Sequence, residues 1–197
     1  MHNYHYIVAS LPELTSGWKF QERSAEQIIG EIRELCGKDD LALLDILQES
    51  FVPENLTQEF YKKALASGNS FIREYFTFDL KVRNAKVRYL NRELSRPADK
   101  DVISIPLQEE NSEEDAGIEA AFKGTDLLAR ERAVDDLYWE KADALSLMHW
   151  FDMNVIMAFV LKLHIIDRWN LLDEQTGREM FRKLVDNLTQ TNKNLSI

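Results

Sequence analysis

The chain has very little cysteine, since Cys36 is the only one among 197 residues. A single cysteine cannot form an internal disulfide, which excludes a disulfide-stapled fold. The first residues also lack the basic region and the small-residue cleavage site of a secretory signal. From these two observations we expect a cytoplasmic location.

Basic residues are outnumbered, with 24 Lys and Arg against 34 Asp and Glu, and the formal net charge is −10. An acidic field repels phosphate, so nucleic acid and anionic membrane surfaces are poor partners. The most apolar stretch, 153–166, is interrupted by Asn154, Lys162 and His164 and is shorter than the roughly 18 uncharged residues that a bilayer span needs. We interpret it as a buried core helix and expect membrane contact only through partner proteins.

Common motifs of catalytic and cofactor sites are absent: the sequence has no Gly-x-Ser-x-Gly, His-Glu-x-x-His or Cys-x-x-Cys. The nearest approach to a nucleotide-binding loop starts at Gly30. Six residues separate Gly30 from Gly37 where four are needed, and Asp39 replaces the hydroxyl that binds magnesium. We therefore expect no catalytic residues and no cofactor.

Two histidine–carboxylate pairs, His149 with Asp152 and His164 with Asp167, have the i, i+3 spacing by which one helix face offers two metal ligands. Two ligands do not complete a site, and di-iron bundles repeat Glu-x-x-His on several helices instead. We interpret the pairs as a helix cap and partly buried histidines, and expect no metal site.

Most of the chain has helical spacing of its apolar residues. Ser24 opens a capping box in front of one helix, and Thr57 caps another. No Gly or Pro interrupts 70–94, so one long helix, or two joined at Asp79, fits that stretch. These signals predict an all-α fold.

Three other segments complete the expected organisation. Residues 4–11 are rich in aromatic and β-branched side chains without a helical period, so we expect a short extended N-terminal segment. Prolines and an acidic run at 109–115 make 95–112 a solvated connector. Beyond it, Thr125 is expected to cap a helix, and a last amphipathic helix is expected around 181–188.

A thirteen-residue pattern that begins at Phe78 returns 73 residues later at Phe151, with six identical positions. The repeat predicts one helical unit duplicated within the chain, in units of about 24–94 and 113–190 that cover each other's apolar surfaces. Coincidence between two amphipathic helices is the alternative, although apolar spacing alone does not require the shared Asp and Ala. The repeat positions to which we assign a structural role are Phe78, Asp79, Ala85, Phe151, Asp152 and Ala158.

Asp79 and Asp152 occupy the same position of the repeat, where a carboxylate can cap a helix or a kink. A catalytic pair would need substrate-binding groups around it, and the sequence places none nearby. We expect a structural role for both rather than general acid–base chemistry.

The apolar residues of 70–94 fall into two stripes on nearly opposite sides of a helix, which predicts packing from two directions. Lys81, Arg88 and Arg92 form a ridge between the stripes, which is either a partner surface or an ordinary solvated face. The stripes are Phe78, Val82, Ala85 and Tyr89, and Leu80, Val87, Leu90 and Leu94.

Three tryptophans, Trp139, Trp150 and Trp169, are expected in the core. An exposed apolar patch around one of them would instead indicate a binding surface.

Several segments resemble a known family: residues 6–12, 78–84, 130–139 and 151–169. They are similar to a bacterial family of unknown function whose members accompany V-type ATP synthase genes and resemble the C subunit of that machine, a relative of the eukaryotic d subunit. The resemblance covers about residues 4 to 185. It implies a noncatalytic coupling piece between the membrane rotor ring and the central shaft. The C subunit has three helical units, whereas this chain shows two.

We therefore predict two related helical-bundle halves packed as one unit, acting as a structural subunit of a V-type ATPase or ATP synthase. The expected partners are the rotor ring and the central shaft, with Lys81, Arg88 and Arg92 as candidate contacts.

Two alternatives remain open. One is a small helical enzyme or ligand-binding protein that uses Asp79, Asp152 and His164 in a pocket between the halves. The other is a free-standing dimeric scaffold.

Overall fold

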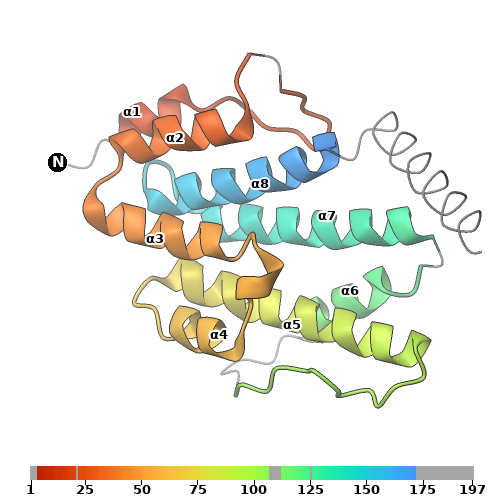
Figure 1. Ribbon diagram of the computed structural model, residues 1–197. Coiled ribbons are helices and arrows are strands. Elements are labelled where there is room, and N and C mark those ends of the chain that lie inside the picture. The colour runs from red at the N-terminus through yellow and green to blue at the C-terminus, as the bar shows by residue number, and fades with distance from the viewer. Residues whose placement is uncertain (1–3, 21, 107–111, 125, 172–197) are drawn as a thin grey trace, which may run out of the picture.

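The computed structural model describes residues 4–20, 22–106, 112–124 and 126–171, and every regular element within these ranges is a helix (Figure 1). The predicted all-α class is therefore confirmed. The elements are α1 (Tyr4–Ser10), α2 (Ala25–Leu35), α3 (Lys38–Glu49), a short 3-10 helix η1 (Pro53–Asn55), α4 (Gln58–Leu65), α5 (Ser70–Glu93), α6 (Ser112–Ala121), α7 (Leu127–Ser146) and α8 (Met153–Leu171).

The predicted caps form. The hydroxyl of Ser24 accepts a hydrogen bond from the amide of Gln27 at 3.2 Å, and the Gln27 side chain accepts from the Ser24 amide at 2.8 Å. Thr57 accepts from the amide of Phe60 at 3.2 Å and starts α4. Each cap satisfies a backbone donor that the helix itself leaves open. Residues 70–93 form one unbroken helix rather than two.

Helix α8 lies at the centre of the fold and contacts α1, α2, α3 and α7; Figure 1 shows α1 and α2 above it and α7 below it. Consecutive residues from Ile156 to Leu161 are all buried, which an amphipathic surface helix cannot achieve. The prediction of a buried core helix for this stretch is confirmed. No helix within the described ranges is long and apolar enough to span a membrane.

The expectation of an extended N-terminal segment is wrong, because Tyr4–Ser10 is helix α1. Ile7 is 1% exposed, and Tyr4, Val8 and Leu11 pack around the same core. These four residues have the spacing i, i+3, i+4 and i+7, so they form a helical stripe despite their β-favouring side chains. Burial of that stripe against α8 outweighs the weak intrinsic preference for a strand.

Helix α5 joins two apolar clusters. Phe78 and Val82 are buried against α6 and α7, and the partly buried Ala85 and Tyr89 pack beside them, as the first predicted stripe requires. The second stripe is only partly confirmed. Leu80 is 1% exposed and packs in the main core, whereas Leu90 and Leu94 are 46% and 57% exposed near the end of the helix.

Residues 98–103 of the predicted connector are tied to α5 by side-chain amide groups. The side chain of Asn84 both donates to the carbonyl of Ile103 at 2.9 Å and accepts from its amide at 3.0 Å. Asn91, which is 4% exposed, donates to the carbonyls of Ala98 and Lys100. Residues 98–103 are therefore held in place rather than simply solvated.

Helix α6 was not predicted as a separate element. It begins at Ser112, inside the expected connector, and its first turn carries Glu113, Glu114 and Asp115. Carboxylates are favourable there because the first turn of a helix carries partial positive charge. The same acidic run that suggested a loop thus begins a helix. Thr125 and 172–197 lie outside the described residues, and Asp126 caps α7 by accepting from the amide of Ala129 at 2.6 Å.

Helices of each predicted repeat unit pack against helices of the other unit. Helix α8, from the later unit, packs on α2 and α3 of the earlier one, while α5 packs on α6 and α7 (Figure 1). One continuous body results.

We expect Asn84→Ala to lower the free energy of unfolding by about 1–2 kcal/mol, because two hydrogen bonds to the connector are lost together. Hydrogen exchange at the Ile103 amide should accelerate, and urea denaturation measures the stability. Arg88→Ala is the control. It removes an exposed ion pair to Asp99 on the same connector and should cost less than about 1 kcal/mol. Unchanged exchange at Ile103 would contradict the assigned role of Asn84.

Candidate functional site

The three residues of the possible ligand pocket, Asp79, Asp152 and His164, lie in different places. Asp79 is in the middle of α5, Asp152 precedes α8, and His164 lies on α8 itself. His164 lies eleven positions after Met153 in the helix, which is roughly 16 Å along the axis. The groove that contains His164 includes neither Asp79 nor Asp152. The described structure does not bring the three together.

Asp79 is a buried carboxylate that joins three helices. Its two oxygens accept hydrogen bonds from the hydroxyls of Tyr61 on α4, at 2.6 Å, and Tyr138 on α7, at 2.7 Å. Burial raises the pKa of Asp79, while these hydrogen bonds and Arg83 act in the opposite direction. The cap predicted for Asp79 is wrong because the residue is inside a continuous helix whose amides are already paired. It serves as an interhelical hydrogen-bond acceptor.

Asp152 does cap a helix, as predicted. One oxygen accepts from the amides of Asn154, at 3.0 Å, and Val155, at 3.4 Å, and the other pairs with the His149 ring. The first two positions of the repeat therefore differ between the copies. Phe78 is buried in mid-helix at 3% exposure, whereas Phe151 precedes α8 and is 46% exposed. Ala85 and Ala158 lie within α5 and α8.

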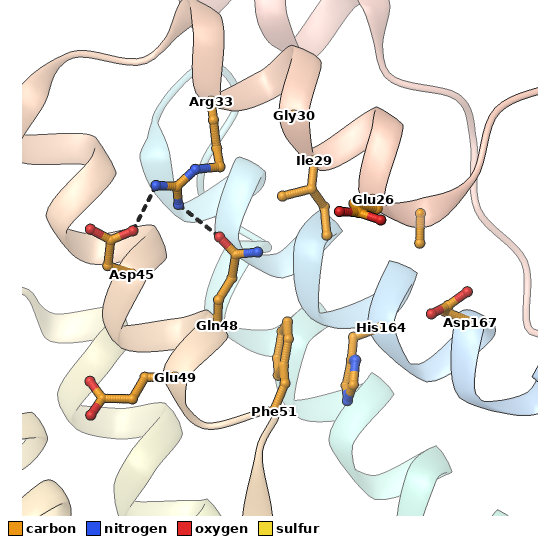
Figure 2. A pocket seen from close by; sticks show the side chains of 11 residues that line it. Glu26, Ile29, Gly30, Arg33, Asp45, Gln48, Glu49, Phe51, His164 and Asp167 are labelled. Carbon is orange, nitrogen blue, oxygen red and sulfur yellow. Dashed lines mark hydrogen bonds and ion pairs between the residues drawn. The ribbon is translucent and has the colours of Figure 1, made fainter. Parts of the chain in front are cut away.

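His164 lies in an open groove of about 730 Å³ between α2, α3 and α8 (Figure 2). Its ring stacks on Phe51, with centroids 3.8 Å apart and planes 1° from parallel. Burial, with a smaller effect of Arg168, lowers the pKa of His164 from 6.5 to about 4, so the ring is neutral at pH 7. The groove is lined by Ala25, Glu26, Ile29, Gly30, Arg33, Asp45, Gln48, Glu49, Phe51, His164 and Asp167.

The three cations of the predicted ridge have different environments. Lys81 is 12% exposed and pairs with Glu114 at 3.5 Å and Asp115 at 3.2 Å on α6. Arg88 pairs with Asp99 of the connector at 2.9 Å, and Arg92 is exposed. Lys81 thus helps to join α5 and α6, while the other two remain on the surface.

Sequence reasoning missed a buried contact between α7 and α8. Asp135, which is 4% exposed, accepts hydrogen bonds from Arg168 and from the indole of Trp169, the latter at 2.5 Å. Burial raises the pKa of Asp135, whereas Arg168 and the indole act to lower it. Trp139 is half-buried beneath Lys162, whose amine lies 4.9 Å from the ring centroid. Trp139 and Trp169 therefore support the packing of α7 and α8.

Trp150 is 78% exposed, so the expectation that it belongs to the core is wrong. It lies between α7 and α8 in a short turn in which Leu147 and Met148 are 73% and 84% exposed. We call residues 147–151 the apolar turn. Four of its five residues have large apolar side chains, and these do not follow helical spacing. This lack of helical spacing is the sequence signal that could have set them apart from core residues.

The apolar turn is held at both ends. The backbone amide of His149 donates to the carbonyl of Ser146 at 2.9 Å, and the His149 ring pairs with the Asp152 cap. The ring centroids of Phe151 and of His5 on α1 are 4.3 Å apart. Large exposed apolar side chains on a fixed turn are typical of a protein contact rather than of a solvated loop.

No group of three or more His, Cys, Asp or Glu side chains in the described ranges is arranged to hold a metal ion. The His149 and Asp152 pair is used as a helix cap, and His164 stacks on Phe51.

Residues 107–192 are similar to a family described as a protein of unknown function, DUF2764. The matched stretch is less than half of the chain, and it includes α6, α7, the apolar turn and α8. No curated protein and no solved structure gives a significant match.

We expect Tyr138→Phe to lower the free energy of unfolding by about 1–3 kcal/mol at pH 7, because the buried Asp79 carboxylate loses one of its two hydroxyl donors. In an Asp79→Asn background the same change should cost about 1 kcal/mol or less, since the acceptor is then neutral. Urea denaturation of the four proteins measures both costs. Tyr6→Phe, at a 62% exposed position, is the control and should be neutral. Equal costs in the two backgrounds would refute a charge-dependent hydrogen bond.

The low pKa of His164 gives a prediction with a definite sign. The unfolded chain binds a proton near pH 6.5 and the folded protein only near 4, so stability is lost as the pH falls through this window. His164→Phe keeps an aromatic ring beside Phe51 and should reduce the loss between pH 7 and pH 5 by about 2 kcal/mol. Denaturation at the two pH values gives the difference between variant and parent. A difference that does not change with pH would contradict the assignment.

Proposed function

We propose that this protein is a noncatalytic structural subunit of a larger assembly, and that the apolar turn is one of its docking surfaces. The observation that carries the proposal is the exposure of Trp150 together with Leu147 and Met148 on a turn fixed by hydrogen bonds of His149 to Ser146 and Asp152. Tryptophan is enriched at the centres of protein interfaces because one rigid side chain buries a large area there.

The carboxylates that could have served as catalytic acids or bases support the same proposal, because they are used in structural hydrogen bonds. Asp79, Asp135 and Asp152 all accept hydrogen bonds that position helices. Asp79 joins α4, α5 and α7, and Asp135 joins α7 to α8. Such contacts fix helices relative to one another, which suits a part that transmits force through its shape.

The assembly that we propose is a V-type ATPase or ATP synthase, in which the protein links the rotor ring to the central shaft from the cytoplasmic side. This identification rests on the sequence resemblance given above. The exposed Arg88 and Arg92 remain candidate contacts, whereas Lys81 is engaged with α6. Membrane association would come through the partner subunits.

Affinity isolation from the protein's own cells tests the proposal. Tagged protein in mild detergent should bring down the A, B and rotor-ring subunits, identified by mass spectrometry. Trp150→Ser combined with Met148→Ser should reduce their recovery at least about tenfold, because interface tryptophans typically contribute 2 kcal/mol or more.

Leu94→Ser is the matched control, since it changes a 57% exposed leucine at the far end of α5 and should leave recovery unchanged. Isolation of the parent protein alone would argue against the assembly. Equal recovery with the Trp150 variant and with the control would argue against the apolar turn.

A further inference from the structure

The groove between α2, α3 and α8 has an apolar centre and carboxylates at both ends (Figure 2). Glu26 and Asp167 lie on one side, Asp45 and Glu49 on the other, and Ile29, Phe51 and His164 lie between them (Figure 2). The arrangement differs from an ordinary acidic surface because the charges flank an aromatic and aliphatic floor.

The residues that line the groove carry more negative than positive charge. Its single guanidinium, Arg33, pairs with Asp45 at 2.8 Å and donates to Gln48 at 2.7 Å. Glu26 and Asp167 form no ion pair with any residue that the structure describes, and Glu49 is 4.0 Å from Lys63. His164 adds no positive charge at pH 7. Glu26 and Asp167, which have no ion-pair partner among the described residues, therefore favour a cationic occupant.

The shape of the groove favours a helix. The space is open to solvent and bounded by three helices, which is the setting in which an amphipathic helix lays its apolar face into a groove. Gly30 lies in the wall, and a Cβ built there meets no heavy atom within 4 Å. The wall of α2 thus leaves room above Gly30 for a side chain of the occupant.

We infer that this groove binds a basic amphipathic helix of a partner protein, with an apolar side chain on Ile29 and Phe51 and Lys or Arg side chains against Glu26, Glu49 and Asp167. This site is separate from the apolar turn. His164 lies three turns along α8 from the turn, so variants of one surface leave the other intact.

A designed peptide tests the inference on the full-length protein. The probe is a fluorescent helix of about 21 residues that repeats Leu-Lys-Lys-Leu-Leu-Lys-Lys, long enough to be helical when bound. Its comparator carries Glu in place of each Lys. We expect the lysine peptide to bind, as measured by fluorescence anisotropy, and the glutamate peptide to bind at least about tenfold more weakly.

A variant that fills the groove distinguishes binding in the groove from attraction by the general negative charge of the protein. Gly30→Trp leaves every charge in place and should weaken the lysine peptide at least about tenfold, because the indole occupies the apolar centre. Gly30→Ala should keep binding within about twofold and should stabilise α2, since alanine loses less backbone entropy than glycine in a helix interior. Thermal unfolding of both variants verifies that they fold.

The charges are tested by a matched pair of double variants. Glu26→Gln with Asp167→Asn should weaken binding about tenfold at low salt, whereas Glu59→Gln with Glu93→Gln, on exposed positions of α4 and α5, should change it about twofold or less. Equal effects of the two pairs, or undiminished binding by Gly30→Trp, would overturn the inference.

Photo-crosslinking from the centre of the peptide gives an independent readout. Adducts on α2, α3 and α8 are expected, and adducts on the apolar turn or on α5 would overturn the inference. Light scattering on the parent protein measures its oligomeric state and so tests whether a second copy of the chain occupies the groove. A dimer that Gly30→Trp converts to a monomer would mean that a second copy of the chain occupies the groove, which also overturns it.

Discussion

The arrangement of the whole molecule depends on the burial of α8. This helix is apolar on all sides from Ile156 to Leu161, and such a helix is stable in water only when neighbours cover its full circumference. Helices α1, α2, α3 and α7 all pack against it, with α1 and α2 above α8 and α7 below it in Figure 1. Segments from the two ends of the described chain are therefore brought to the same place.

The covering of α8 also positions both candidate surfaces. The turn that leads from α7 into α8 must reverse the chain in a few residues, and it projects Leu147, Met148 and Trp150 into solvent. Further along α8, the helix meets α2 and α3 without filling the space between them, which leaves the groove around His164. One central helix thus separates the mainly apolar surface of the turn from a mixed apolar and acidic one.

Buried polar groups then fix the angles at which the helices pack. Asp79 and Asp135 each accept two hydrogen bonds from other helices or from aromatic side chains, in surroundings where an unpaired carboxylate would be costly. Lys81 and Lys141 both contact Glu114 and join α6 to α5 and α7. These contacts make the relative positions of the helices specific, because apolar packing alone tolerates several alternatives.

The amino-acid sequence by itself determined the helical class, the caps at Ser24 and Thr57 and the burial of α8, whereas it left one helix or two for 70–94 and the structure shows one. The class, the caps and the burial follow from local spacing and from side chains that bond to nearby amides. It did not reveal α1, since the same four apolar residues fit a strand or a helix until α8 covers one face.

Only the tertiary structure decided which carboxylates cap helices and which join them, and which tryptophan is exposed. Asp79 and Asp152 match in sequence, but Asp79 accepts hydrogen bonds from α4 and α7, whereas Asp152 accepts them from backbone amides next to it in the chain. Trp150 and Trp169 are equally apolar, and their exposure depends on which segments lie beside them. Contacts between distant residues carry no local signature, and this is the physical reason that these features required the fold.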